Sequence, residues 1–179
     1  MFKSILAASA LGLGLIGAAS ASTVTVDVDA MANSTGGGVG YATGVILTAG
    51  EAYTVSAALD DTWSLGSEDP CTRTSNADGL GNVCYPDYSQ NGLTTDYGTL
   101  VGQINGGAFF IVGTAFNDVA SDSGELLLFL FDSNAGDNSG SIAATITTAD
   151  VAPVPLPAAG LLLLGGLGGL GALRRRKAA

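Results

Sequence analysis

The sequence contains no histidine and few basic residues, with six Lys and Arg against sixteen Asp and Glu in 179 residues. Without histidine, the chain lacks the usual general base and the commonest zinc ligand. Five of the basic residues lie near the termini, so segment 22–152 has Arg73 as its single basic residue and a net charge of −15. Such a surface repels phosphate backbones, and we expect no nucleic-acid partner. It is typical of a soluble, salt-adapted surface or of one that attracts divalent cations.

Cysteine is also scarce, since the chain has only Cys71 and Cys84. The pair has no C-x-x-C spacing, and with no histidine present it does not resemble a zinc or redox motif. Outside the cytoplasm a cysteine pair in a polar segment typically forms a disulfide. We therefore predict a bond between Cys71 and Cys84.

The N-terminal segment 1–21 has the three parts of a secretory signal peptide. Lys3 gives a positive start, an apolar run follows, and Ala19 and Ala21 supply the small-x-small pattern that signal peptidase needs. We predict cleavage after Ala21, which makes Ser22 the mature N-terminus. The alternative is a retained anchor, for which the apolar run is short.

The C-terminal segment 153–179 contains an apolar run at 158–173 that is followed at once by a basic cluster at 174–177. With the residues before it, this run approaches the length of a membrane-spanning helix. The positive-inside rule places the basic end in the cytoplasm and the middle domain outside. Pro155 and Pro157 hold the chain extended just before the helix.

This tail resembles the VPLPA-type C-terminal sorting signal, a relative of the PEP-CTERM signals. Its motif consists of Val154, Pro155, Leu156, Pro157 and Ala158. The resemblance implies cleavage near the motif by an exosortase-type membrane enzyme, in a bacterium that makes extracellular polysaccharide. The chain would be anchored only transiently, before it reaches the cell surface or the extracellular space. The alternative is a plain single-pass anchor.

The middle segment 22–152 shows strand patterns and no helical period longer than two turns. Alternating or apolar runs occur at 23–29, 44–47, 52–57, 97–104, 109–112, 126–131 and 141–147, with glycine, asparagine and aspartate between them. Short strands at this spacing predict an all-β fold, a single β-sandwich or jelly roll. Because the run 126–131 is apolar at every position, we predict a central strand covered on both faces.

Two polar stretches are candidate functional sites. The first, 67–91, contains the cysteine pair, and a loop of this length is usually functional. The second, 132–140, links two strong strand patterns and is rich in aspartate, asparagine and serine. Calcium takes six to eight oxygen ligands, so the second stretch is a candidate calcium site. The alternative is an ordinary turn, because asparagine, aspartate and glycine also favour turns.

The middle segment resembles the galactose-binding-like sandwich of calcium-dependent galactophilic bacterial lectins. The matching pieces are 44–55, 76–79, 97–104, 124–132 and 137–141. The resemblance implies that Asp132, Asp137 and Asn138 are side-chain calcium ligands and that Leu65 lies near a position that donates a backbone carbonyl. It also implies that sugar hydroxyls complete the metal shell, beside Asp132 and Asn138. In this sequence the loop is about two residues shorter than in those lectins.

The single tryptophan, Trp63, is the remaining candidate ligand-binding residue. An indole ring can stack on the face of a sugar, although a lone tryptophan in a sandwich can equally be a core residue. Because the sequence has no histidine, it has no counterpart of the histidine that contacts the sugar in those lectins.

We therefore expect an exported, noncatalytic module that binds carbohydrate, with calcium as cofactor and extracellular polysaccharide as partner. One alternative is a structural envelope or biofilm protein without a small-molecule ligand. Another is a hydrolase with paired carboxylates, either Asp60 and Asp61 or Asp132 and Asp137. Adjacent side chains on a strand point to opposite faces, which argues against the first pair.

Overall fold

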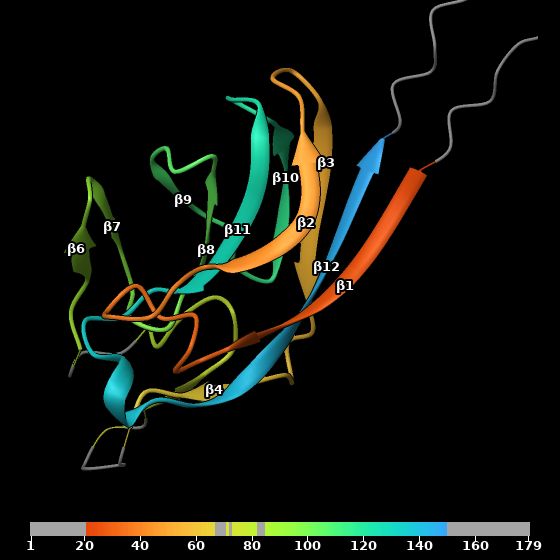
Figure 1. Cartoon of the computed structure of the whole chain (residues 1–179). Coiled ribbons are helices and arrows are strands. Elements are labelled where there is room, and N and C mark those ends of the chain that lie inside the picture. The colour runs from red at the N-terminus through yellow and green to blue at the C-terminus, as the bar shows by residue number, and fades with distance from the viewer. Residues whose placement is uncertain (1–20, 67–70, 72, 82–84, 150–179) are drawn as a thin grey trace, which may run out of the picture. The chain divides into compact units, whose positions relative to one another are not determined.

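The computed structural model describes residues 21–66, 71, 73–81 and 85–149, and these belong to one compact unit (Figure 1). The predicted signal peptide except its last residue, Ala21, lies outside the described residues, as do the sorting tail with its transmembrane segment and Cys84. Within the described ranges, no helix is long and apolar enough to cross a membrane. The same ranges contain no free cysteine, and the pairing of Cys71 with Cys84 stays a prediction.

Regular secondary structure among the described residues is almost entirely β-strand. The strands are β1 (Ala21–Asp29), β2 (Tyr41–Leu47), β3 (Ala52–Ala57), β4 (Trp63–Ser64), β5 (Thr74–Ser75), β6 (Tyr88–Gln90), β7 (Leu93–Thr95), β8 (Leu100–Ile104), β9 (Phe109–Ile111), β10 (Ala115–Val119), β11 (Gly124–Leu130) and β12 (Ser139–Ala149). The one helical element among them is a short 3-10 turn, η1 (Ala135–Asp137), between β11 and β12.

Two sheets form the sandwich. The first has the order β10-β3-β12-β4-β5, with β1 also paired to β12, and the second has the order β2-β11-β8-β9. A separate hairpin consists of β6 and β7. Strands β1 and β12 pair antiparallel along their length, from Ala21 opposite Ala149 to Asp29 opposite Ser141 (Figure 1). The two ends of the described chain are therefore joined in one ladder.

The core lies between the two sheets and follows the two-residue period of the strands. From the first sheet, Ile142, Ala144 and Ile146 of β12 are buried, and from the second, the leucines at alternate positions 126, 128 and 130 of β11. Burial of such side chains is the main favourable contribution to folding, at about 25 cal/mol per Å² of apolar surface.

Strand β11 is apolar on its other face as well. It lies between β2 and β8, and its Phe129 packs with Phe131 and Val101 in a second cluster. Tyr88 and Leu93 of the β6–β7 hairpin and Phe109 of β9 pack against this cluster. The prediction of a central strand covered on both faces is confirmed.

The predicted strands are present, but their neighbours include elements that the sequence patterns did not indicate. The stretch 67–91, predicted as one long loop, contains β5 and the whole of β6. The strand predicted from residue 97 starts only at Leu100, because Gly98 has a φ of +83° and Thr99 closes a turn onto the carbonyl of Asp96. Glycine adopts such a positive φ without the steric cost of a side chain.

Candidate functional site

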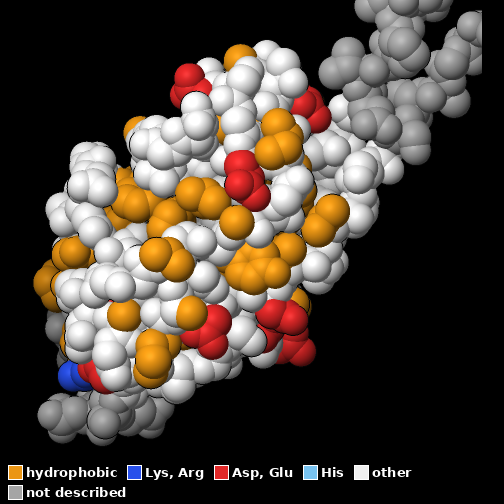
Figure 2. Space-filling view, in the orientation of Figure 1, with side chains coloured by type: hydrophobic (Ala, Val, Ile, Leu, Met, Phe, Trp, Pro, Cys, Tyr) orange, Lys and Arg blue, Asp and Glu red, His pale blue; other side chains and the backbone are white. Residues whose placement is uncertain are grey.

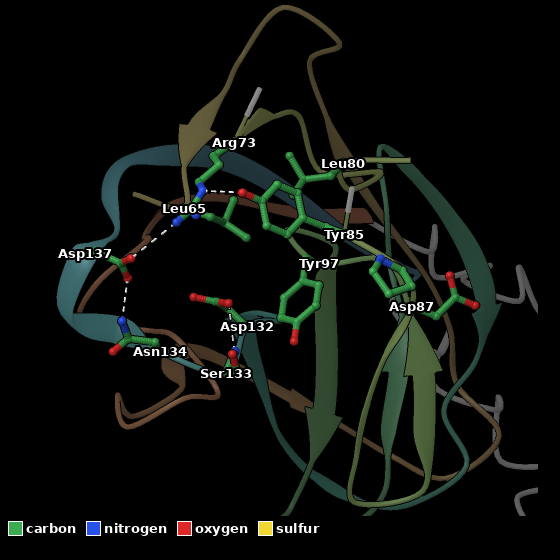
Figure 3. Close-up of a pocket in the computed structure, with 11 residues that line it drawn as sticks. Leu65, Arg73, Leu80, Tyr85, Asp87, Tyr97, Asp132, Ser133, Asn134 and Asp137 are labelled. Carbon is green, nitrogen blue, oxygen red and sulfur yellow. Dashed lines mark hydrogen bonds and ion pairs between the residues drawn. The ribbon is translucent and has the colours of Figure 1, made fainter. Parts of the chain in front are cut away.

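A pocket of about 360 Å³ lies beside the 132–138 loop, between that loop and the segments that lead into β6 and β8 (Figure 3). Its wall combines charged, aromatic and aliphatic side chains. The lining residues are Leu65, Arg73, Leu80, Tyr85, Pro86, Asp87, Tyr97, Asp132, Ser133, Asn134 and Asp137.

The position of the 132–138 loop is fixed by the loop that follows β1. The hydroxyl of Thr35 donates a hydrogen bond to the carbonyl oxygen of Asp132 at 2.9 Å and accepts one from the backbone N–H of Asp132 at 3.0 Å. Next to it, a Cβ at Gly36 would lie 2.4 Å from the carbonyl carbon of Ser133. Only glycine permits this close approach of the two loops.

Asp132 is the most buried carboxyl group of the pocket, at 6% exposed. Its Oδ1 accepts a hydrogen bond from the Ser133 amide at 2.7 Å. Burial raises the pKa of the Asp132 carboxyl; hydrogen bonds from Asn138, Ser133 and Asn134 oppose the rise, and the charge of Asp137 adds to it. The carboxylate thus lies in surroundings that supply less than full compensation for its charge.

Asn138 is 1% exposed, and its side chain lies close enough to the Asp132 carboxyl to lower the pKa of that group. Its Nδ2 donates to the carbonyl oxygen of Ala30 at 3.2 Å. Its Oδ1 is buried and has no hydrogen-bond partner among the described residues. A buried acceptor without a partner costs about 1–3 kcal/mol, so this oxygen is available to a donor or a cation.

Asp137 ends η1 and points into the pocket from the opposite side to the tyrosines (Figure 3). Its Oδ1 accepts a hydrogen bond from Asn134 Nδ2 at 2.7 Å, and its Oδ2 lies 3.8 Å from Nη1 of Arg73. Gly66 lies beside this carboxylate, where a Cβ would be 2.6 Å from Oδ2, and its φ of +115° favours glycine. The ion pair is partly exposed, with side chains 29% and 42% exposed for Arg73 and Asp137, and such a pair contributes at most about 1 kcal/mol.

Arg73 is held more firmly by the aromatic wall. Its Nε donates to the Tyr85 hydroxyl at 2.6 Å, and its guanidinium carbon lies 5.1 Å from the centre of the Tyr85 ring. Tyr97 meets Tyr85 edge-on at 6.4 Å and stacks on Tyr88 at 4.8 Å between ring centres. The pocket therefore has one apolar, aromatic side and one side of carboxylates and amides.

The structure brings the predicted metal-binding residues together. Asp132, Asp137 and Leu65 line one pocket, and Asn138 is a buried neighbour of Asp132 that does not itself line the pocket. No three His, Cys, Asp or Glu side chains form a metal-binding group in the described part of the chain. A cation here would therefore need the Asn138 amide oxygen and backbone carbonyls in addition to the two carboxylates.

The prediction that Trp63 stacks on a sugar is corrected by the structure. Trp63 is 1% exposed and belongs to the core between the sheets. Its Nε1 donates to the carbonyl oxygen of Gly98 at 2.9 Å. A large side chain that is both buried and hydrogen-bonded has a packing role.

Of the two carboxylate pairs of the hydrolase alternative, one lines the pocket and the other does not. Asp61 Oδ2 accepts a hydrogen bond from the Ala143 amide at 2.7 Å, and neither Asp60 nor Asp61 lines the pocket. Asp132 and Asp137 do line it, and each accepts a hydrogen bond from another residue of the 132–138 loop.

Sequence reasoning did not assign the residues of the aromatic wall, Tyr85, Tyr97 and Leu80, or Arg73, which contacts this wall. One signal was present, because Arg73 is the single basic residue of segment 22–152. In Figure 2, basic surface lies beside acidic surface at the lower left of the molecule. A lone cation in so acidic a domain indicates a specific local partner, and here the partners are Tyr85 and Asp137.

Comparisons with known proteins support the fold. No protein-family model matches the chain, and no curated protein matches it. Among solved structures, the chain is similar to the "EclA N-terminal domain; PllA-like lectin", with a TM-score of 0.51 and 24% sequence identity over 70% of this chain and 95% of that chain. At this identity the likeness establishes the fold alone, and the predicted all-β sandwich is confirmed.

Proposed function

We propose that this chain is an exported, noncatalytic carbohydrate-binding module that binds sugar in the pocket beside the 132–138 loop. The observation that carries the proposal is the buried, unpartnered Oδ1 of Asn138 together with its neighbour Asp132, whose buried carboxyl lines a pocket with an aromatic wall. Buried acceptors of this kind need a donor or a cation from outside the chain.

Calcium is the cofactor that fits these residues. Asp132, Asp137 and Asn138 would hold it through side-chain oxygens, and Leu65 would add its backbone carbonyl. Calcium prefers carboxylate, amide and carbonyl oxygens, and it would compensate the charge of Asp132, whose pKa is raised by burial. When bound, the ion would supply coordination positions for sugar hydroxyls.

The chain's own residues would position the sugar. Tyr85, Tyr97 and Leu80 offer the apolar surface on which the C–H face of a pyranose packs. Opposite them, Asp132, Asn134 and Asp137 offer hydrogen-bond partners for hydroxyl groups (Figure 3). Ligand pockets generally combine an apolar lining with a few fixed polar groups in this way.

Export and sorting form the second part of the proposal. Signal peptidase would cut after Ala21, which removes only the last residue pair, Ala21 opposite Ala149, from the β1–β12 ladder. An exosortase-type enzyme would then cut near 154–158, beyond the end of β12. Intact mass spectrometry of the protein from its native host tests both steps. A chain that keeps 174–177 would instead be a single-pass anchor.

Binding to a glycan array, with calcium and with a chelator, tests the carbohydrate proposal. The array should include neutral galactosides, other neutral and acidic sugars, and the polysaccharide of the producing cell. We expect calcium-dependent signals that Asp137→Asn reduces. Asp122→Asn is the matched control, because it removes an exposed carboxylate outside the pocket.

The alternative is a structural envelope protein without a small ligand. The Arg73–Asp137 pair favours it, because this pair neutralises one pocket carboxylate from within the chain. Absence of any array signal from folded protein, in both calcium and chelator, would support this alternative and contradict the carbohydrate proposal.

A further inference from the structure

Arg73 contacts the same carboxylate that is proposed to bind calcium. Its Nη1 lies 3.8 Å from Oδ2 of Asp137, while Oδ1 of Asp137 is occupied by Asn134. We infer that Arg73 is a built-in competitor of calcium, which neutralises Asp137 when the ion is absent and keeps the calcium affinity of the pocket low. The inference rests on the proposed calcium site and concerns its regulation.

The contact between Arg73 and Asp137 is suited to exchange. At 3.8 Å it is an ion pair without a hydrogen bond, and both side chains are partly exposed. By contrast, Asn134 holds the carboxylate in place at 2.7 Å. Calcium could therefore displace the guanidinium from Asp137 without reorganising the loop.

The guanidinium would nevertheless remain close to the ion. Its Nε is bound to the Tyr85 hydroxyl at 2.6 Å, and it lies over the Tyr85 ring at 5.1 Å. These contacts do not involve Asp137, so they persist when calcium takes the carboxylate. A positive charge fixed at the edge of the pocket repels a divalent cation within it.

The expected consequence is a weak calcium site. At the short separations of this pocket, repulsion by one unit charge lowers calcium affinity roughly tenfold, even with nearly water-like screening. Extracellular modules bind calcium with dissociation constants of about 0.1–1 mM. Arg73 would thus confine loading of the site to calcium-rich surroundings, although the domain as a whole is strongly acidic.

Calcium titration calorimetry of the purified full chain in detergent tests this inference. Arg73→Gln should bind calcium roughly tenfold more tightly than the wild type. Arg73→Lys, which keeps the charge, should shift the affinity much less. Asn117→Asp is the matched control: it changes the net charge by the same amount on β10, where the side chain is exposed and outside this pocket. Its affinity should stay near that of the wild type.

The outcomes separate the inference from the proposed function. If wild type and Arg73→Gln bind calcium equally, or the variant binds less tightly while its circular dichroism is native, the inference is wrong and the calcium site stands. If Asn117→Asp gains as much as Arg73→Gln, the effect comes from overall charge and the inference is also wrong. If neither wild type nor Arg73→Gln binds calcium, both the inference and the calcium proposal fail.

Discussion

The side chain of Asn138 lies close enough to the carboxyl of Asp132 to lower its pKa, across the two ends of the loop that joins β11 to β12. Both residues are buried, and the rest of the described chain compensates the polar group of each only in part. Folded proteins retain such groups at the expense of stability mainly where function needs them. The relationship therefore predicts a gain in stability when the charge is removed.

Asp132→Asn should stabilise the calcium-free protein at neutral pH. Burial raises the pKa of Asp132 in the folded state. The wild type therefore has its full free energy of unfolding below the unfolded pKa of this carboxyl, where the group is protonated. It loses part of that free energy as the pH rises through the folded pKa and the buried group becomes charged. The variant lacks this loss. Urea unfolding in chelator between pH 3 and pH 7 should show the gain growing as pH rises through the acidic range. Parallel profiles for wild type and variant would contradict the prediction, and Asp122→Asn is the exposed control.

Calcium should stabilise the wild type more than ionic strength alone can. At a hundredfold excess over the dissociation constant, binding to the folded state adds about 2.7 kcal/mol, which raises the melting temperature by several degrees. Asp137→Asn should lose the calcium-specific part and keep the part due to screening. Differential scanning calorimetry with magnesium and sodium at matched ionic strength provides the controls. An equal response of wild type and variant would make the loop an ordinary turn.

Trp63→Phe should destabilise the fold and leave sugar binding in place. The change removes the 2.9 Å hydrogen bond to the buried carbonyl of Gly98 and leaves it only the long 3.5 Å contact from the Ser75 hydroxyl, which costs about 1–3 kcal/mol. Chemical denaturation measures this loss, and the glycan array measures binding at a temperature where the variant is folded. A loss of binding in a fully folded variant would restore Trp63 as a sugar-contacting residue.

Much of the fold could be predicted because its long strands have a strong pattern. The alternation in 23–29 and 141–147 identifies β1 and β12, and the continuous apolar run at 126–131 identifies a strand buried on both faces. The two- and three-residue strands β4, β5, β6 and β7 are too short for any period to be seen. They are formed by tertiary contacts, such as the stacking of Tyr88 on Tyr97.

The sequence predicted one side of the candidate site, the 132–138 loop, and missed the aromatic wall opposite it. The 132–138 loop is local in sequence, so its carboxylates and amides could be recognised together. The aromatic wall comes from separate segments, and nothing local indicates that Arg73, Tyr85 and Tyr97 meet. Trp63 was misplaced because a tryptophan has the same local signature whether it faces the core or a ligand.

The disulfide prediction connects this wall to stability. Arg73 and Tyr85 lie next to Cys71 and Cys84 in the sequence, and they meet through a 2.6 Å hydrogen bond. A bond between the cysteines would close this segment and contribute on the order of 3 kcal/mol by restricting the unfolded chain. Replacing both cysteines by serine should therefore lower the free energy of unfolding by about this amount and weaken ligand and calcium binding, because the Arg73–Tyr85 contact loses its support. Non-reducing peptide mapping of exported protein should find the linked peptides, and two free thiols there, or a double variant as stable as the wild type, would contradict the prediction.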